Sequence, residues 1–249
     1  MLQRIVRVRW LVASLCITAI IGCRSTPEPV SISLTRAGTV FARAVDETAA
    51  LSDPERQVTI LATIANGMRQ AGHDDDAASV VREAVRLARG LTVSPEIVRL
   101  RLTLAEILLK AGEPADARQL IADATSYARG LFDETVRADL LVSIVESALA
   151  SADDTRDLLP AVVDEMYVIE DTALRAASLI SVAEAYQRVG VGQSVTGLIN
   201  QAIPAIRSAS DPQRRAVLFA RLSFRASEAS DVDLALDLVA GLLGHVLAG

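Results

Sequence analysis

The sequence predicts an all-α protein, an α-solenoid of about five helix-turn-helix repeats with an extra helix capping its N-terminal end. The apolar pattern between Asp53 and Gly90 recurs along the chain with a period near 40 residues. A fixed period of this length indicates stacked structural repeats. Aromatic residues make up only 3% of the chain, which suits closely packed helices. Helix-start signals also recur at the same point of successive repeats.

The first helix of each repeat is predicted by apolar residues at i, i+3, i+4 and i+7, which form one face of an α-helix. In the first repeat these residues are Leu61, Ile64, Ala65 and Met68. The matching residues of the next four repeats are Leu104, Ala105 and Leu108; Leu141, Ile144, Val145 and Ala148; Leu179, Val182, Ala183 and Tyr186; and Phe219, Leu222, Ser223 and Ala226. Arg101 interrupts this pattern, either as a register slip or as a polar contact.

The second helices repeat as well. Ala77, Val81 and Ala84 of the first repeat recur as Ala117, Ile121 and Ala124, and again as Val195, Ile199 and Ala202. Residues 34–51 carry the same pattern and are therefore predicted to form the capping helix. The second helix of the third repeat is irregular, because Pro160 lies near its start and is tolerated there if Asp157 caps the helix.

Capping residues mark the ends of the predicted helices. Five residues with a side-chain oxygen precede the first helices and are expected to cap them: Asp53, Ser94, Asp133, Asp171 and Asp211. Small residues follow the first helices, and the glycines among them are Gly72, Gly112 and Gly190. Glycine suits such a junction because a helix C-terminus often requires a left-handed residue.

The order of these residues resembles the tetratricopeptide repeat. In the first repeat it is Ile64-Ala65, Met68, Gly72, Ala77, Val81 and Ala84, and in the second it is Leu104-Ala105, Leu108, Gly112, Ala117, Ile121 and Ala124. The resemblance covers roughly residues 34–247 and implies a right-handed solenoid. The period near 40 exceeds the ~34 residues of that family, and its bulky Trp is absent. HEAT-like helix pairs are therefore the alternative architecture.

Residues 1–22 are predicted to be a signal peptide. Arg4, Arg7 and Arg9 precede an apolar stretch that is short for a membrane span. It ends in Ile20-Ile21-Gly22-Cys23, which resembles the lipobox of bacterial lipoproteins and implies that Cys23 is lipidated. The alternative is an uncleaved signal anchor with an incidental cysteine.

The remaining chain divides into a tether over residues 23–33, which includes the lipidated Cys23, and the repeat domain over residues 34–249. By the same resemblance, an acidic residue after the cysteine favours the inner membrane. Because position 24 is arginine, we expect the periplasmic face of the outer membrane, with the inner membrane as the alternative.

Charge and composition bear on the function classes. Removal of the signal peptide takes away three arginines and would change the net charge from −6 to −9, which argues against nucleic-acid binding. His73 and His245 are the only histidines and have no metal-ligand spacing. No phosphate loop or nucleophile motif occurs. We therefore expect no catalysis, no metal and no cofactor.

Two surfaces are candidate binding sites. In tetratricopeptide arrays the first helices line a concave groove, and the resemblance assigns nine residues to it: Asn66, Arg69, Gln70, Glu106, Lys110, Glu146, Glu184, Gln187 and Arg188. The alternative is that these are ordinary solvated helix faces. At the C-terminal end, Leu236, Leu243 and Leu247 are left on the outside of the predicted last helix. They are expected to contact a second copy of the chain, a partner or the membrane surface.

The sequence therefore predicts a non-catalytic, lipid-anchored scaffold that mediates protein–protein interactions in the bacterial cell envelope. The alternative is a periplasmic peptide- or ligand-binding sensor that regulates an envelope enzyme. The partner itself is not specified by any motif.

Overall fold

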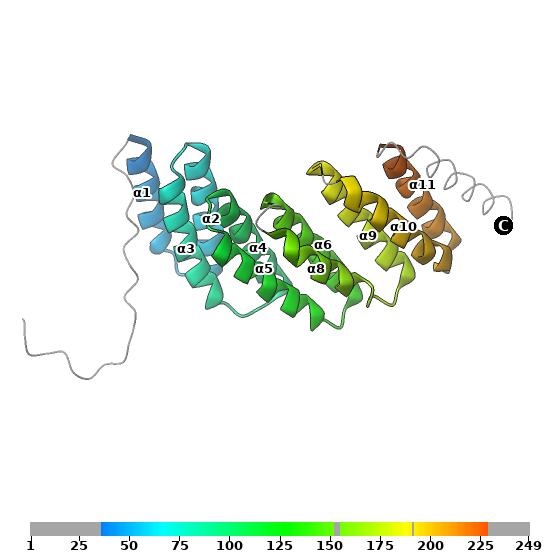
Figure 1. Ribbon diagram of the computed structural model, residues 1–249. Coiled ribbons are helices and arrows are strands. Elements are labelled where there is room, and N and C mark those ends of the chain that lie inside the picture. The colour runs from blue at the N-terminus through cyan, green and yellow to red at the C-terminus, as the bar shows by residue number, and fades with distance from the viewer. Residues whose placement is uncertain (1–35, 152–154, 191, 229–249) are drawn as a thin grey trace, which may run out of the picture.

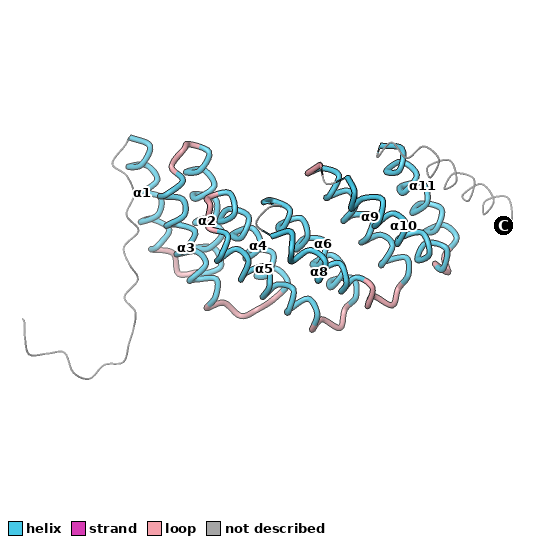
Figure 2. Tube along the Cα trace, viewed as in Figure 1, coloured by secondary structure: helices cyan, strands magenta, loops and turns pink. Residues whose placement is uncertain are grey.

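The chain is described here by a computed structural model over residues 36–151, 155–190 and 192–228. Within these ranges it forms ten α-helices, two short 3₁₀-helices and no strand (Figure 2). The α-helices are α1 (Arg36–Ala49), α2 (Pro54–Gln70), α3 (Asp74–Arg89), α4 (Pro95–Lys110), α5 (Pro114–Arg129), α6 (Glu134–Ala148), α8 (Leu159–Met166), α9 (Thr172–Arg188), α10 (Gly192–Ser208) and α11 (Pro212–Glu228). The 3₁₀-helices are η1 (Leu149–Ser151) and η2 (Arg156–Leu158). The all-α prediction is confirmed for this part of the chain.

The helices pack in sequential pairs, as Figure 1 shows. We call α2, α4, α6, α9 and α11 the first helices. The first four of these pack against the helices that follow them, which are α3, α5, α8 and α10. Each first helix also contacts the next first helix, so the five form a continuous row. This packing of neighbours is consistent with the predicted helical repeat.

The core runs without interruption from α2 to α11. Small residues occupy the same buried position in four successive first helices: Ala65, Ala105, Val145 and Ala183. Small side chains at these positions allow neighbouring helices to approach closely. Larger side chains such as Met68 and Leu108 are fully buried beside them, and each contributes about 1.5–3 kcal/mol through its burial.

The capping helix α1 packs against α2. The Phe41 ring lies 3.6 Å from the point that a Cβ atom on Gly67 would occupy, so the ring covers the backbone of α2. It also meets the His73 ring edge-on, with 6.2 Å between the ring centroids. His73 therefore contributes to the contact between α1 and the first helix pair.

The predicted N-caps are confirmed. Asp53, Asp133, Asp171 and Asp211 each accept two backbone N–H groups through one carboxylate oxygen, and Ser94 accepts one through its hydroxyl. Each such cap stabilises its helix by about 1 kcal/mol.

The predicted left-handed glycines are also confirmed. Gly72, Gly112 and Gly190 have φ angles of 80°, 79° and 77°. At the end of α2, the His73 N–H donates to the Met68 carbonyl and the Gly72 N–H to the Arg69 carbonyl. This pair of bonds is the Schellman motif, which satisfies the last carbonyl groups of the helix.

The third repeat departs from the others, as predicted. Its second helix α8 is only 8 residues long, and Pro160 occupies its first turn. The expectation that Asp157 caps this helix is wrong, because Leu158 is the N-cap residue and provides no side-chain bond. Asp157 instead accepts two hydrogen bonds from Arg118 of α5, at 2.7 and 2.6 Å.

Candidate partner-binding surface

The five first helices expose one stripe of side chains each, at the spacing i, i+4, i+7 and i+11 that defines a helix face. We call these stripes together the first-helix face. Its members are exposed or half-buried: Thr59, Thr63, Asn66 and Gln70; Arg99, Thr103, Glu106 and Lys110; Asp139, Ser143, Glu146 and Ala150; Ala177, Ser181, Glu184 and Arg188; and Val217, Arg221 and Phe224. Seven of the nine predicted groove residues lie on this face.

Depressions lie along the first-helix face where neighbouring helices meet. One of about 190 Å³ is lined by residues of α4 and α6, including Glu106 and Glu146. A second, of about 100 Å³, lies between α6 with η1 and α9, and includes Glu146 and Arg188 in its lining. A third, of about 610 Å³, is lined by α6, α9 and α11. Predicted groove residues therefore line the first two depressions.

Three of the predicted groove glutamates bond to the next first helix. Glu106 accepts a hydrogen bond of 2.8 Å from the Ser147 hydroxyl. Glu146 forms an ion pair of 2.6 Å with Arg188. Because each bond joins residues about 40 positions apart, the glutamates tie successive repeats together.

Glu184 forms the largest cluster of this kind. Its carboxylate accepts two bonds of 2.8 Å from Arg221 and one of 3.2 Å from Arg225. Burial alone would raise the pKa of the Glu184 carboxyl, but the hydrogen bonds and charges of both arginines outweigh it and hold that pKa below its ordinary value. Glu184 is therefore ionised and stabilises the junction between α9 and α11.

Four other predicted groove residues, Arg69, Gln70, Lys110 and Gln187, differ in burial. Arg69 lies 3.5 Å from the Asn66 side-chain oxygen, and its Nε atom is buried without a hydrogen-bond partner. Gln187 is likewise half-buried, with an unpartnered Oε1 atom. Gln70 and Lys110 are exposed. Arg69 and Gln187 thus lie against neighbouring structure, whereas Gln70 and Lys110 face solvent.

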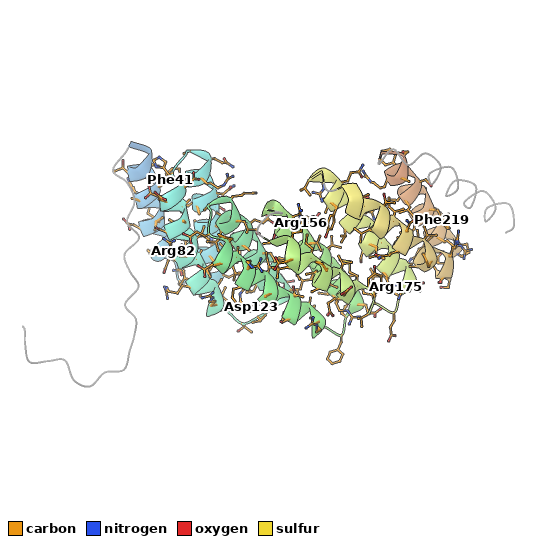
Figure 3. The ribbon with its side chains drawn as sticks, in the orientation of Figure 1. Phe41, Arg82, Asp123, Arg156, Arg175 and Phe219 are labelled. Atoms are coloured by element: carbon orange, nitrogen blue, oxygen red, sulfur yellow. The ribbon has the colours of Figure 1, made fainter. Side chains whose placement is uncertain are left out.

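Three residues that the sequence analysis did not single out join the first helices α2, α9 and α11 to the preceding turn. Gln57, Arg175 and Arg215 lie four residues after their N-caps, and each donates to a backbone carbonyl at the end of the helix before: that of Leu51, Ile169 or Ala209. Figure 3 shows Arg175 at the loop end of α9. The spacing of four residues after an aspartate N-cap was visible in the sequence, but it does not specify the contact, since Arg137 at the same position of α6 pairs with Glu134.

Arg101 belongs to the same group by function. Its guanidinium donates to the Ala88 carbonyl at the end of α3, at 2.7 Å. Of the two interpretations of this residue, the polar contact is therefore correct. A cation at a helix C-terminus is favoured by the helix dipole.

The depression of about 610 Å³ combines charged and apolar lining residues. It is lined by Thr135, Asp171, Ala173, Leu174, Ala177, Asp211, Gln213, Arg214, Val217 and Leu218. An adjoining depression of about 330 Å³ shares Asp171, Asp211 and Arg214 with it and adds Glu170. The sequence analysis placed no groove residue here.

Several other predictions lie outside the described residues. These are the lipidated Cys23, the tether, and the apolar end formed by Leu236, Leu243 and Leu247. Among the residues that are described, no helix is long and apolar enough to cross a membrane. In the same ranges, no cluster of three His, Cys, Asp or Glu side chains is placed to hold a metal ion.

Comparison with known proteins gives no family. No protein-family model matches the chain, and no curated protein matches it. Among solved structures it is similar to the crystal structure of BtubC (BKLC) from P. vanneervenii, with a TM-score of 0.40 and 18% sequence identity over 84% of this chain and 89% of that chain. This likeness is too low to carry a functional argument.

Proposed function

We propose that this protein is a non-catalytic, lipid-anchored scaffold of the bacterial cell envelope that binds protein partners through its first-helix face. In this proposal the helix pairs form a right-handed, tetratricopeptide-like solenoid. The observation that carries it is the row of depressions along four adjoining first helices, α4, α6, α9 and α11. Repeat arrays characteristically bind partners through such an extended surface.

The side-chain contacts along the face support a pre-organised surface. Glu106, Glu146 and Glu184 each bond to the next first helix. Such contacts hold neighbouring repeats in one relative position before a partner arrives. A pre-organised surface loses less conformational entropy on binding, which increases affinity.

The envelope location in this proposal rests on the sequence. A basic n-region, an apolar stretch and Ile20-Ile21-Gly22-Cys23 together favour lipidation of Cys23. Residues 24–33 would then act as an extended tether of roughly 30 Å, at about 3.3 Å per residue. We place the protein on the periplasmic face of the outer membrane.

A ligand-binding sensor that regulates an envelope enzyme is the second candidate. The depression of about 610 Å³ between α6, α9 and α11 favours it, because its volume falls in the range of small-molecule and peptide sites. A sensor would be stabilised by one small ligand or peptide, whereas a scaffold would be recovered with protein partners in fixed stoichiometry.

The test is crosslinking of the full-length protein in envelope membranes, followed by purification and identification of its partners. A face variant combines Gln70→Glu, Thr103→Glu and Val217→Glu, all at exposed positions of the first-helix face. A matched control combines Ala122→Glu, Ser126→Glu and Asn200→Glu, all exposed on second helices. Both variants add three negative charges.

We expect the face variant to lose the partner and the control to retain it. Cys23→Ala should abolish incorporation of labelled fatty acid and release the protein from the membrane fraction. A partner that both variants retain would exclude the first-helix face as the binding site. Incorporation of fatty acid into the Cys23→Ala protein would refute the anchor.

A further inference from the structure

The depression between α6, α9 and α11 differs in chemistry from the rest of the first-helix face. At one position of the face, the side chain is polar in the first three repeats and apolar in the last two: Thr59, Arg99, Asp139, Ala177 and Val217. Val217 is 62% exposed although it is a branched aliphatic residue. Leu174, which is half-buried, and Leu218, which is buried, line the same depression.

Two aspartates of the lining, Asp171 and Asp211, each use one carboxylate oxygen as a helix cap and have the other in a long ion pair with Arg214. The Oδ1 atom of Asp171 accepts from two backbone N–H groups of α9, and the Oδ1 atom of Asp211 does the same for α11. The nearest cation, Arg214, lies 3.9 Å from Asp171 Oδ2 and 3.8 Å from Asp211 Oδ2. Both distances are too long for a hydrogen bond.

The charge here is not balanced as it is elsewhere on the face. Asp139 is paired with Arg99, Glu146 with Arg188, and Glu184 with Arg221, all at hydrogen-bonding distance. At the two adjoining depressions, Glu170, Asp171 and Asp211 share only Arg214 among the lining residues. The site therefore has a surplus of negative charge next to an apolar surface.

We propose that this depression binds a segment of a protein partner in which a lysine or arginine is adjacent to an apolar side chain. The ligand's cation takes the place of Arg214 beside the Oδ2 atoms of Asp171 and Asp211, and the apolar side chain packs on Val217 and Leu174. The inference rests on the proposed function, since it assigns one site on the first-helix face and the chemistry of its ligand. Charge complementarity selects this occupant over an acidic one.

The test begins with a random 12-residue peptide library selected against the immobilised full-length protein. We expect the enriched peptides to share a lysine or arginine within two positions of Leu, Ile, Val or Phe. One enriched peptide is then synthesised with a fluorophore, and its dissociation constant is measured by anisotropy at low and at physiological salt. Higher salt should weaken its binding, because the contact includes ion pairs.

The decisive variant combines Asp171→Asn and Asp211→Asn. Asparagine caps a helix as well as aspartate does, so the variant removes charge but retains both helix starts. We expect the dissociation constant of the peptide to rise by about tenfold or more, as the loss of a hydrogen bond to a charged group implies. The matched control combines Asp53→Asn, another N-cap, and Asp123→Asn on α5, and should leave the constant unchanged.

The outcomes separate this inference from the proposed function. Enriched peptides that lack a cation, or binding that the Asp171→Asn and Asp211→Asn variant does not weaken, overturn the inference. If such peptides still lose binding in the Gln70→Glu, Thr103→Glu and Val217→Glu variant, the first-helix face keeps its proposed role. If free amines bind the protein but no peptide is enriched, the inference is also overturned, and a small-molecule sensor is favoured.

Discussion

Replacement of Glu184 by glutamine tests whether the first helices are held together by ion pairs. Glu184 accepts three hydrogen bonds from two arginines of the next repeat. Its side chain is 21% exposed, while those of Arg221 and Arg225 are 38% and 28% exposed. An exposed ion pair contributes about 0.2–1 kcal/mol to the free energy of unfolding, and partial burial raises this contribution. We expect Glu184→Gln to lower the free energy of unfolding by about 1–2 kcal/mol at pH 7.

The pH dependence of this loss has a definite sign. Because the pKa of Glu184 is lowered from its ordinary value of 4.5 in the folded protein, its contribution to stability is fully present above pH 4.5. It disappears as the pH falls through the folded-state pKa, where the carboxyl becomes neutral. The difference in unfolding free energy between wild type and Glu184→Gln should therefore be largest at pH 7 and smaller at pH 3.

Urea unfolding followed by circular dichroism at both pH values measures the effect, and amide hydrogen exchange locates it. Loss of the cluster should increase exchange in α11 before the other helices, because each repeat is stabilised mainly by its neighbours. The control is Glu113→Gln, which removes one exposed pair with Arg82 and should cost at most about 0.5 kcal/mol. Equal stability of Glu184→Gln and wild type at pH 7 would refute the reasoning, as would a difference that does not shrink between pH 7 and pH 3.

Three further predictions concern the helix ends and can be measured by urea unfolding at pH 7. Gly72→Ala should destabilise the protein by about 1 kcal/mol, because φ is 80° there. Gly197→Ala in α10 should stabilise the protein by about 0.5–1 kcal/mol, because an added Cβ atom meets no other atom there. A loss of stability at both glycines would contradict this prediction. Asp211→Ala should cost about 1 kcal/mol and Asp211→Asn almost nothing, so equal costs would exclude a capping role. Arg215→Met should cost about 1 kcal/mol by freeing the Ala209 carbonyl, and an unchanged unfolding midpoint would show that this bond contributes nothing.

The features predicted best from the sequence are those set by local chemistry. An N-cap such as Asp133 acts on backbone groups two and three residues away, and Gly112 acts within its own turn. The apolar face of each helix depends only on helix geometry, so it too could be predicted from the spacing of apolar residues. These local signals also specified where one repeat ends and the next begins.

Contacts between repeats could not be predicted in the same way. The pair formed by Glu146 and Arg188 spans 42 positions, and it depends on how far one helix slides along its neighbour. The same limit explains the error at Asp157, which bonds to Arg118 across 39 positions and leaves the nearer helix start without a side-chain cap. Sequence spacing gave the face of each helix but not the partner of each side chain.

These contacts bear on which part of the first-helix face can recognise a partner. A carboxylate that already has hydrogen-bonded arginines, as Glu184 has, must exchange one partner for another on binding, so its net contribution to affinity is small. The Oδ2 atoms of Asp171 and Asp211 are held less tightly, since Arg214 forms only long ion pairs of 3.9 and 3.8 Å with them. A ligand cation there gains contacts without breaking any of comparable strength. Specific recognition is therefore expected at the depression between α6, α9 and α11, while the paired glutamates keep the repeats in register.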